Sequence, residues 1–275
     1  MTTTTTTTAL AARGVTLAYD GDPVFEGLDL EVETGRVTTF IGANGSGKST
    51  LLKALGRVLR PGSGTVELDG APIRSLPTRE VARRLAILPQ KPLTPTATSV
   101  RDLVARGRHP HQSMFRPWTA ADAAAVDAAL AATGMAALAD RDAGSLSGGQ
   151  LQRAWIALVL AQEAPVVLLD EPTTFLDLTH QLDVLRLVRS INRTRGTTVV
   201  MVLHDLSLAA RYSDRLVVLG RGRVLADGAP WDVLTPEVLR DAFDLDARVV
   251  PDPSCGTPLV VPVEPAGDHA PVWVG

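Results

Sequence analysis

The chain has 275 residues, enough to bury a large core in one α/β domain or in two lobes that share a sheet. Its 45% hydrophobic and 21% charged residues are typical of a globular protein, and a net charge of −3 gives no electrostatic support for a nucleic-acid partner. The sequence has no run of about eighteen apolar residues that would cross a bilayer, and its single cysteine, Cys255, excludes an internal disulfide framework.

Residues 1–9 are a threonine-rich stretch without the basic start and the long apolar segment of a secretory signal. Low-complexity polar segments of this kind do not bury a core. We therefore expect residues 1–9 to form a flexible lead, and we expect the protein to remain in the cytoplasm.

Further along the chain, short apolar runs bounded by turn residues predict strands. Several of these runs are too continuously apolar for a half-exposed strand, which favours an α/β sheet covered on both faces. The predicted strands are 37–41, 66–68, 84–88, 166–169, 198–203, 216–219 and 223–226.

The middle of the chain differs, because it is rich in helix formers and has few strand candidates. A proline-rich loop leads into this part, and the end of the chain has two short valine-rich pieces around a Pro/Gly turn. The predicted division is a core lobe at 10–90 and 161–243, a helical lobe at 91–160, and a tail at 244–275 that contains a small β-hairpin.

The predicted strand 37–41 leads into GANGSGKST and then into a helical pattern, which is the phosphate-loop spacing in its strand–loop–helix context. Glycines let backbone amides curl around a phosphate chain, and the helix start adds its positive end. Lys48 supplies a point charge, and Ser49 is expected to ligate Mg²⁺. The loop therefore predicts a nucleoside triphosphate site made by Gly42, Asn44, Gly45, Ser46, Gly47, Lys48, Ser49 and Thr50.

Two adjacent carboxylates, Asp170 and Glu171, follow the predicted strand 166–169. Ligands of open α/β sheets bind at the carboxyl ends of the strands, so we expect both side chains to lie near the phosphate loop. We predict that Asp170 holds Mg²⁺ and that Glu171 orients or deprotonates the water that attacks the γ-phosphate. Such a pair is often only the start of a solvated loop, but the phosphate loop upstream favours the catalytic interpretation.

The string LSGGQ, at 146–150, stands directly before an amphipathic helical pattern. Its serine suits a helix cap, but capping does not require the two glycines that follow. Exposed amides at a helix start bind anions, so the chain has two predicted phosphate-binding helix starts, whereas one nucleotide needs only one. The residues of this second predicted site are Ser147, Gly148, Gly149 and Gln150.

Together, these motifs resemble the ATPase subunits of ATP-binding cassette (ABC) transporters, and the resemblance covers nearly all of 15–243. It implies a P-loop NTPase fold, with a RecA-like lobe that carries an antiparallel β portion, plus a helical lobe. In that family two subunits close head to tail on two ATP·Mg²⁺, and LSGGQ of one subunit covers the γ-phosphate on the phosphate loop of the other. By this resemblance Ser147 and Gly149 act on the nucleotide of a second copy.

The same resemblance implies roles for smaller positions. Gln90 matches the glutamine that reaches Mg²⁺ and the attacking water, and His204 matches the histidine that contacts the γ-phosphate. Tyr19 matches the ring that stacks on adenine, and Asp177 matches the loop that communicates between paired subunits. Phe175 replaces the small residue common in the wider family, which suggests a subfamily.

The strings GRHPHQ and EPTTFLDLTHQ resemble the ATPases of importers for ferric siderophores, haem and cobalamin, the siderophore branch most closely. This implies permease partners in the membrane, an extracytoplasmic substrate-binding protein, and a place on the cytoplasmic face of the inner membrane. His109 and His111 lack carboxylate partners, so we do not assign them to iron. We assign His180 and Gln181 a structural role at a helix start.

Two other function classes share these motifs. Cassette ATPases that act on DNA or ribosomes carry a long coiled-coil insertion or two cassettes in one chain, and this sequence has neither. A degenerate cassette that binds ATP without cleaving it would lack Glu171 or His204, and both are present. We therefore predict an ATPase that energises uptake of an iron-siderophore complex, with haem or cobalamin import as the alternative.

Overall fold

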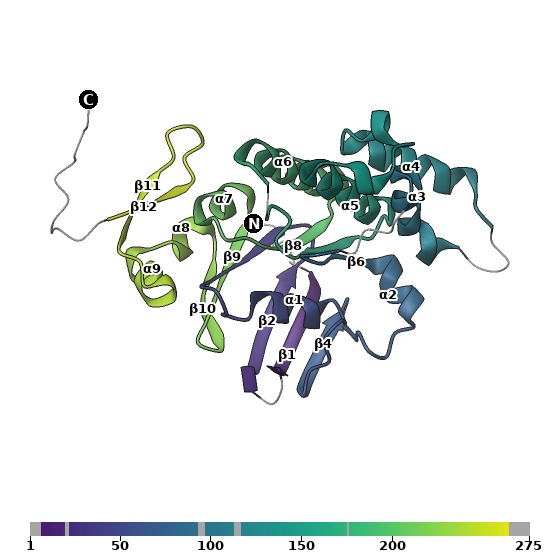
Figure 1. The fold of residues 1–275 in the computed structure, drawn as a ribbon. Coiled ribbons are helices and arrows are strands. Elements are labelled where there is room, and N and C mark those ends of the chain that lie inside the picture. Colours follow the sequence, from purple (N-terminus) through teal and green to yellow (C-terminus); the bar gives the residue numbers. More distant parts are fainter. Residues whose placement is uncertain (1–6, 20–21, 93–96, 113–116, 175, 264–275) are drawn as a thin grey trace, which may run out of the picture.

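Two sheets and a group of helices build the fold (Figure 1). Among the described residues, no helix has both the length and the hydropathy that crossing a membrane requires. The computed structural model describes residues 7–19, 22–92, 97–112, 117–174 and 176–263.

The larger sheet consists of β3 (Val37–Ile41), β6 (Leu85–Leu88), β7 (Val166–Leu169), β8 (Thr198–Val202), β9 (Arg215–Gly220) and β10 (Arg223–Gly228). The strand order is β10-β9-β3-β8-β7-β6, with all pairs parallel except β10 with β9 at one edge. Every residue of β3, β7 and β8 is buried, because both faces of the sheet are covered. This explains the continuously apolar runs from which these strands were predicted.

The smaller sheet is antiparallel and consists of β1 (Thr8–Tyr19), β2 (Asp22–Glu33), β4 (Ser63–Leu68) and β5 (Ala71–Pro72), in the order β2-β1-β4-β5. The strand pattern predicted only part of β4. Strand β1 begins at Thr8, inside the stretch 1–9 predicted to be a flexible lead, which is a correction for the last two residues of that stretch: Ala9 is 1% exposed because its side chain belongs to the apolar core that this sheet shares with α1.

Each face of the larger sheet has its own apolar core, since successive strand residues point in opposite directions. On one face, Phe40 packs with helix α1 (Lys48–Leu55) and with the inner side of the antiparallel sheet. On the other face, Ile41 belongs to a core that includes α5 (Gly148–Ala161), α6 (Leu178–Arg195) and α7 (Leu206–Tyr212). The larger sheet is thus the middle layer of the molecule.

All elements described between Val100 and Ala161 are helical, and Figure 1 shows them gathered at the upper right, beside the edge strand β6. Besides α5 they are α3 (Val100–Ala105), η1 (Arg106–His111), α4 (Ala120–Ala132), η2 (Ala136–Leu138) and η3 (Ala143–Ser145).

The η1 segment, RGRHPH in sequence, connects these helices to the core. The carbonyl oxygen of Pro110 accepts hydrogen bonds from Arg79 and Arg83, which are on α2 (Thr78–Arg84), each at 2.9 Å. Arg108 is 4% exposed and pairs through Nε with Asp122 Oδ1 at 2.9 Å. This arginine therefore has a structural role inside the helical group.

The chain ends with α8 (Pro230–Val233), α9 (Pro236–Phe243) and a hairpin of β11 (Ala247–Pro251) and β12 (Pro258–Pro262), which pair antiparallel. The hairpin lies against α7, where the amide of Val260 donates to Ser207 Oγ at 3.3 Å. Val249 and Val260 pack on the helical-side core, so the hairpin is part of the folded body.

Candidate active site

The phosphate loop connects β3 to α1, and two of its glycines are required by close packing. A Cβ atom at Gly42 would lie 2.2 Å from the carbonyl oxygen of Leu219, and one at Gly47 would lie 2.4 Å from the Phe25 ring. Both residues also have positive φ angles, 153° and 91°, which other residues rarely adopt. The loop can therefore follow this path only with glycine at both positions.

Lys48 is the first residue of α1, and its side chain turns back over the loop. Its ammonium group donates to the carbonyl oxygens of Gly42 and Ala43, at 2.8 and 2.9 Å. Burial lowers the pKa of Lys48, and the nearby carboxylates of Glu171 and Asp170 act in the opposite direction. These carboxylates favour the charged form that a phosphate chain needs.

A hollow of about 290 Å³ opens over this loop. It adjoins a second hollow of about 460 Å³, and Val24 and Gly45 line both of them. The residues around the first hollow are Val24, Asn44, Gly45, Gly47, Lys48, Ser49, Thr50, Glu171 and His204. Ser46 lines the second hollow.

Asp170 lies at the carboxyl end of β7, next to the start of α1. Ser49 Oγ donates to its Oδ1 at 2.6 Å, which joins two of the three predicted metal ligands. Its other oxygen, Oδ2, is buried and has no hydrogen-bond partner among the residues that the structure describes. Burial raises the pKa of Asp170, against the effect of the Ser49 hydrogen bond. A buried carboxylate oxygen without a donor fits a cation at this point.

Glu171 is the centre of a hydrogen-bond cluster at the edge of the hollow. Its Oε1 lies 2.8 Å from His204 Nε2, and its Oε2 accepts from Gln90 Nε2 at 2.7 Å and from Thr174 Oγ1 at 2.8 Å. Of the predicted catalytic residues, Gln90 and His204 therefore both contact Glu171. In this structure the Gln90 side chain donates to Glu171 and not to Asp170.

Thr174 is a site residue that sequence reasoning missed, although it stands in the string EPTT that was used to infer the subfamily. It stands three positions after Glu171, and the turn that follows β7 brings the two side chains together. Burial raises the pKa of Glu171, but the hydrogen bonds from His204, Thr174 and Gln90 outweigh it, and the net shift is downward. The cluster thus favours the ionised form of this carboxyl group.

The LSGGQ residues do not line the hollow over the phosphate loop. Ser147 caps α5, since its Oγ accepts from the Gln150 amide at 3.3 Å and the Gln150 side chain accepts from the Ser147 amide at 3.1 Å. A Cβ atom at Gly148 would meet no atom of the described residues within 4 Å, so α5 is open at its first residue. Asp177 likewise caps α6 and is not part of the hollow.

Two sequence predictions fall on parts that the structure does not describe. Tyr19 ends β1, but its side chain lies outside the described part of the structure, and Phe175 lies outside it altogether.

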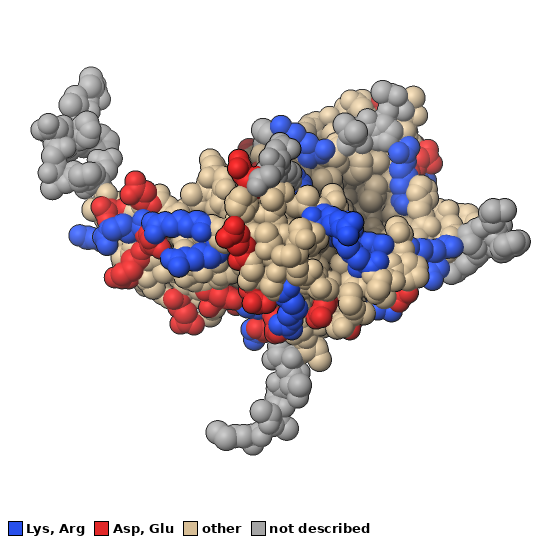
Figure 2. Space-filling model, turned by 90° about the horizontal axis from the view of Figure 1, so that it is seen from below, with Lys and Arg blue, Asp and Glu red and all other residues tan. Residues whose placement is uncertain are grey.

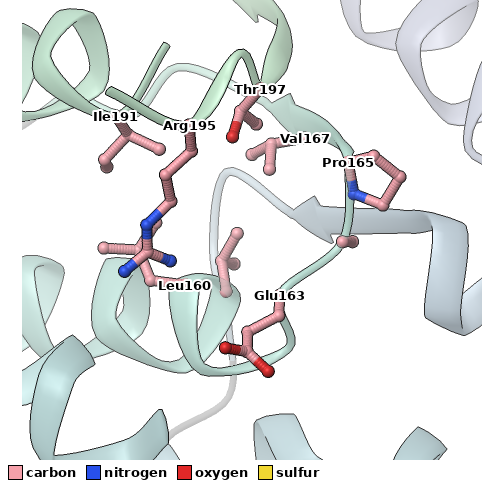
Figure 3. Close-up of a pocket in the computed structure, with 9 residues that line it drawn as sticks. Leu160, Glu163, Pro165, Val167, Ile191, Arg195 and Thr197 are labelled. Atoms are coloured by element: carbon pink, nitrogen blue, oxygen red, sulfur yellow. The ribbon is translucent and has the colours of Figure 1, made fainter. Parts of the chain in front are cut away.

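Another hollow, of about 300 Å³, lies near the opposite ends of the strands, with Pro165 and Val167 of the β7 region on its wall. Arg195 and Glu163 are among the residues that line it (Figure 3), and it shares no residue with the phosphate-loop hollow.

Comparisons with known proteins agree with this geometry. Residues 25–174 match the model of the ABC transporter family. The chain is 49% identical over 255 residues to the achromobactin transport ATP-binding protein of Dickeya dadantii, which covers 93% of this chain and 95% of that protein. It is 48% identical to the ferric enterobactin transport ATP-binding protein of Escherichia coli, over 92% of this chain and 94% of that protein.

Solved structures show the same fold. A metal-chelate type ABC transporter in an inward-facing conformation matches with a TM-score of 0.81 and 29% identity, over 94% of this chain and 98% of that one. A bacterial ABC transporter cassette solved as a dimer matches with a TM-score of 0.71 and 25% identity, over 80% of this chain and 98% of that one. The chain therefore belongs to the ABC transporter family and is an ATPase of that family.

Proposed function

We propose that this chain energises the import of an iron-siderophore complex through a membrane permease. The observation that carries the proposal is the identity of 46–49% to siderophore transport ATP-binding proteins, along nearly the whole chain. A cobalamin import ATP-binding protein of Halobacterium salinarum is 42% identical, and this chain covers only 63% of that protein. The comparison therefore favours a siderophore over cobalamin as the cargo.

We propose that the working unit is a head-to-tail dimer of two copies of this chain. Two observations support it: Ser147, Gly149 and Asp177 do not line the phosphate-loop hollow of their own chain, and α5 is open at its first residue, Gly148. A helix start with free amides attracts a phosphate group. In the dimer, these residues would contact the ATP that is held by the phosphate loop of the other copy.

We propose that the residues around the phosphate loop hold ATP with Mg²⁺. Lys48 binds the phosphate chain, and Ser49 and Asp170 hold the cation, with Gln90 nearby. The cation site is supported by Oδ2 of Asp170, which is buried and has no hydrogen-bond partner among the described residues. Mg²⁺, when bound, neutralises phosphate charge as the γ-phosphate leaves. Tyr19 is proposed to stack on adenine at the end of β1.

We propose that Glu171 is the general base for the attacking water. Its net lowered pKa keeps the carboxylate ionised, and the contacts from Gln90 and Thr174 fix its orientation. His204, which reaches Glu171 from the end of β8, lines the same hollow and is proposed to contact the γ-phosphate. Most of the catalysis then comes from fixed charges and positions, which is usual for phosphoryl transfer.

We propose that the dimer sits on the cytoplasmic face of the inner membrane, bound to permease subunits, and serves an extracytoplasmic substrate-binding protein indirectly. A role on DNA or ribosomes is the rival. Figure 2 shows acidic and basic side chains mixed over much of the face seen from below, without one unbroken basic stripe on that face. A phosphate-backbone partner normally needs such a stripe.

The test is uptake of radiolabelled ferric siderophores by cells that express this chain with the permease that co-purifies with it. We expect uptake of at least one ferric siderophore, and we expect it to be lost with Lys48→Ala at equal expression. Uptake of only cobalamin or haem would refute the siderophore assignment. Sedimentation with ribosomes or DNA in place of a permease would refute the transport role.

A further inference from the structure

The segment that follows Glu171 is joined to the start of α5 at two points. Gln152 Nε2 donates to the carbonyl oxygen of Pro172 at 2.9 Å. Gly149, the second residue of α5, lies against the ring of His180: a Cβ on Gly149 would be 3.1 Å from His180 Cδ2. Gly149 and Gln152 are three residues apart, so they share one helix face. This face of α5 holds both ends of the 172–180 segment.

His180 also holds Asp177. Its ring Nδ1 lies 2.6 Å from Asp177 Oδ1, and its backbone amide donates to the same oxygen at 2.9 Å. A carboxylate accepts hydrogen bonds only, so Nδ1 carries the proton in this contact. Beside it, Gln181 Nε2 donates to the carbonyl oxygen of Leu176 at 2.9 Å. The Asp177 loop is thus fixed from the first turn of α6.

The His180 ring is not needed to cap α6. The backbone amide alone completes the Asp177 cap, as it would with any residue other than proline at this position. The ring adds two further contacts, one to the Asp177 carboxylate and one to the backbone of Gly149 in LSGGQ. Figure 1 shows α5 and α6 drawn beside each other above the sheet, as this contact requires. The ring therefore connects the two parts of the chain that are proposed to reach the second copy.

We propose that His180 is a positioning residue that makes the LSGGQ segment and Asp177 move as one unit. This inference rests on the proposed head-to-tail dimer. When two copies close, Ser147 and Asp177 then arrive at the ATP of the other copy in a fixed relation. A second role follows for Gly149, since any larger residue would push the ring of His180 away.

Three variants separate the two contacts of the ring. His180→Ala removes both; His180→Asn keeps a donor close to where Nδ1 lies but removes the ring over Gly149; His180→Phe keeps the ring but removes the donor. Arg186→Ala is the control, because Arg186 is exposed on the same helix and its ion-pair partner within the described part of the chain is Asp183. ATP hydrolysis is measured as kcat and KM, ATP binding with a fluorescent analogue, and folding as Tm.

We expect kcat to fall about 10- to 100-fold for His180→Ala, because misplacement by about 1 Å costs rates of this order. We expect ATP binding and Tm to stay close to those of the parent, smaller losses of kcat for His180→Asn and His180→Phe, and no change for Arg186→Ala. If kcat of His180→Ala stays within about twofold of the parent, the inference is wrong. A loss of kcat matched by equal losses of ATP binding and Tm would also overturn it, because that is a purely structural role.

Sedimentation in ATP distinguishes this inference from the function on which it rests. Glu171→Gln alone is expected to form an ATP-dependent dimer, and Glu171→Gln with His180→Ala is expected to need about tenfold more protein or more to do so. If Glu171→Gln stays monomeric, the dimer proposal fails and the inference fails with it. If both proteins dimerise equally and the His180 variants keep the parent kcat, the role of His180 alone is refuted.

Discussion

Replacing Glu171 by Gln tests the proposed catalytic base with little change in shape. In the parent, Glu171 Oε2 accepts from Gln90 and Thr174, and Oε1 contacts His204 Nε2. The amide oxygen of the variant can keep both bonds at the Oε2 position. Its NH₂ group then faces His204 Nε2, which accepts a hydrogen bond when the ring is neutral and protonated on Nδ1. The variant should therefore stay folded and bind ATP.

The catalytic loss should be much larger than the structural one. A positioned general base contributes about 10²- to 10⁴-fold in rate, which corresponds to about 2.7–5.5 kcal/mol of barrier. We expect kcat, measured as phosphate release at saturating ATP, to fall by that factor, while ATP binding and Tm stay near the parent values. A variant that retains kcat within about tenfold of the parent would show that Glu171 is not the base.

Three further predictions follow from the same contacts. Thr174→Val removes a hydrogen-bond donor that lowers the pKa of Glu171. The acid limb of kcat/KM, which is expected below the usual glutamate pKa in the parent, should therefore shift to higher pH in the variant. An unchanged pH profile would contradict this. Arg108→Ala leaves a buried carboxylate unpaired and should lower the free energy of urea unfolding by about 3–5 kcal/mol, whereas the exposed Arg106→Ala should have little effect. Asp170→Asn should reduce Mg²⁺-dependent ATP hydrolysis more than it reduces ATP binding measured without Mg²⁺. Equal losses in the two assays would contradict the assignment of Asp170 as a metal ligand.

The sequence predicted the parallel strands well because their burial on both faces leaves a simple apolar signal, as in VTTFI and VVLL. It missed β1 and β2, which are also long strands. Strand β1 contains several alanines and a glycine with φ 57°, and its pairing with β2 is interrupted by register shifts, so its period-2 pattern is weak. In β2, Leu28, Leu30 and Val32 alternate with polar residues, which is the period-2 pattern of a strand with one buried face.

For the site, motif spacing predicted the residues that share the phosphate-loop hollow, because the strand–loop–helix order fixes where they lie. Spacing could not predict which side chains bind each other. The contact of Gln90 with Glu171 joins residues 81 positions apart, and the contact of Gly149 with His180 joins two different helices. Such contacts depend on how α5, α6 and the strand ends pack, which no local pattern encodes. His180, assigned only a structural role from the sequence, gained its importance from this packing.

The terminal hairpin has a practical consequence for anyone who shortens the protein. A cut after Phe243, where the resemblance to the family ends, would remove β11 and β12, whose Val249 and Val260 cover part of the apolar core. It would also expose α7, which begins two residues after His204. A fragment that ends at Phe243 would contain all the family motifs, but it would leave α7 uncovered. Affinity tags and fusion partners belong beyond β12, where an added segment leaves that helix in place.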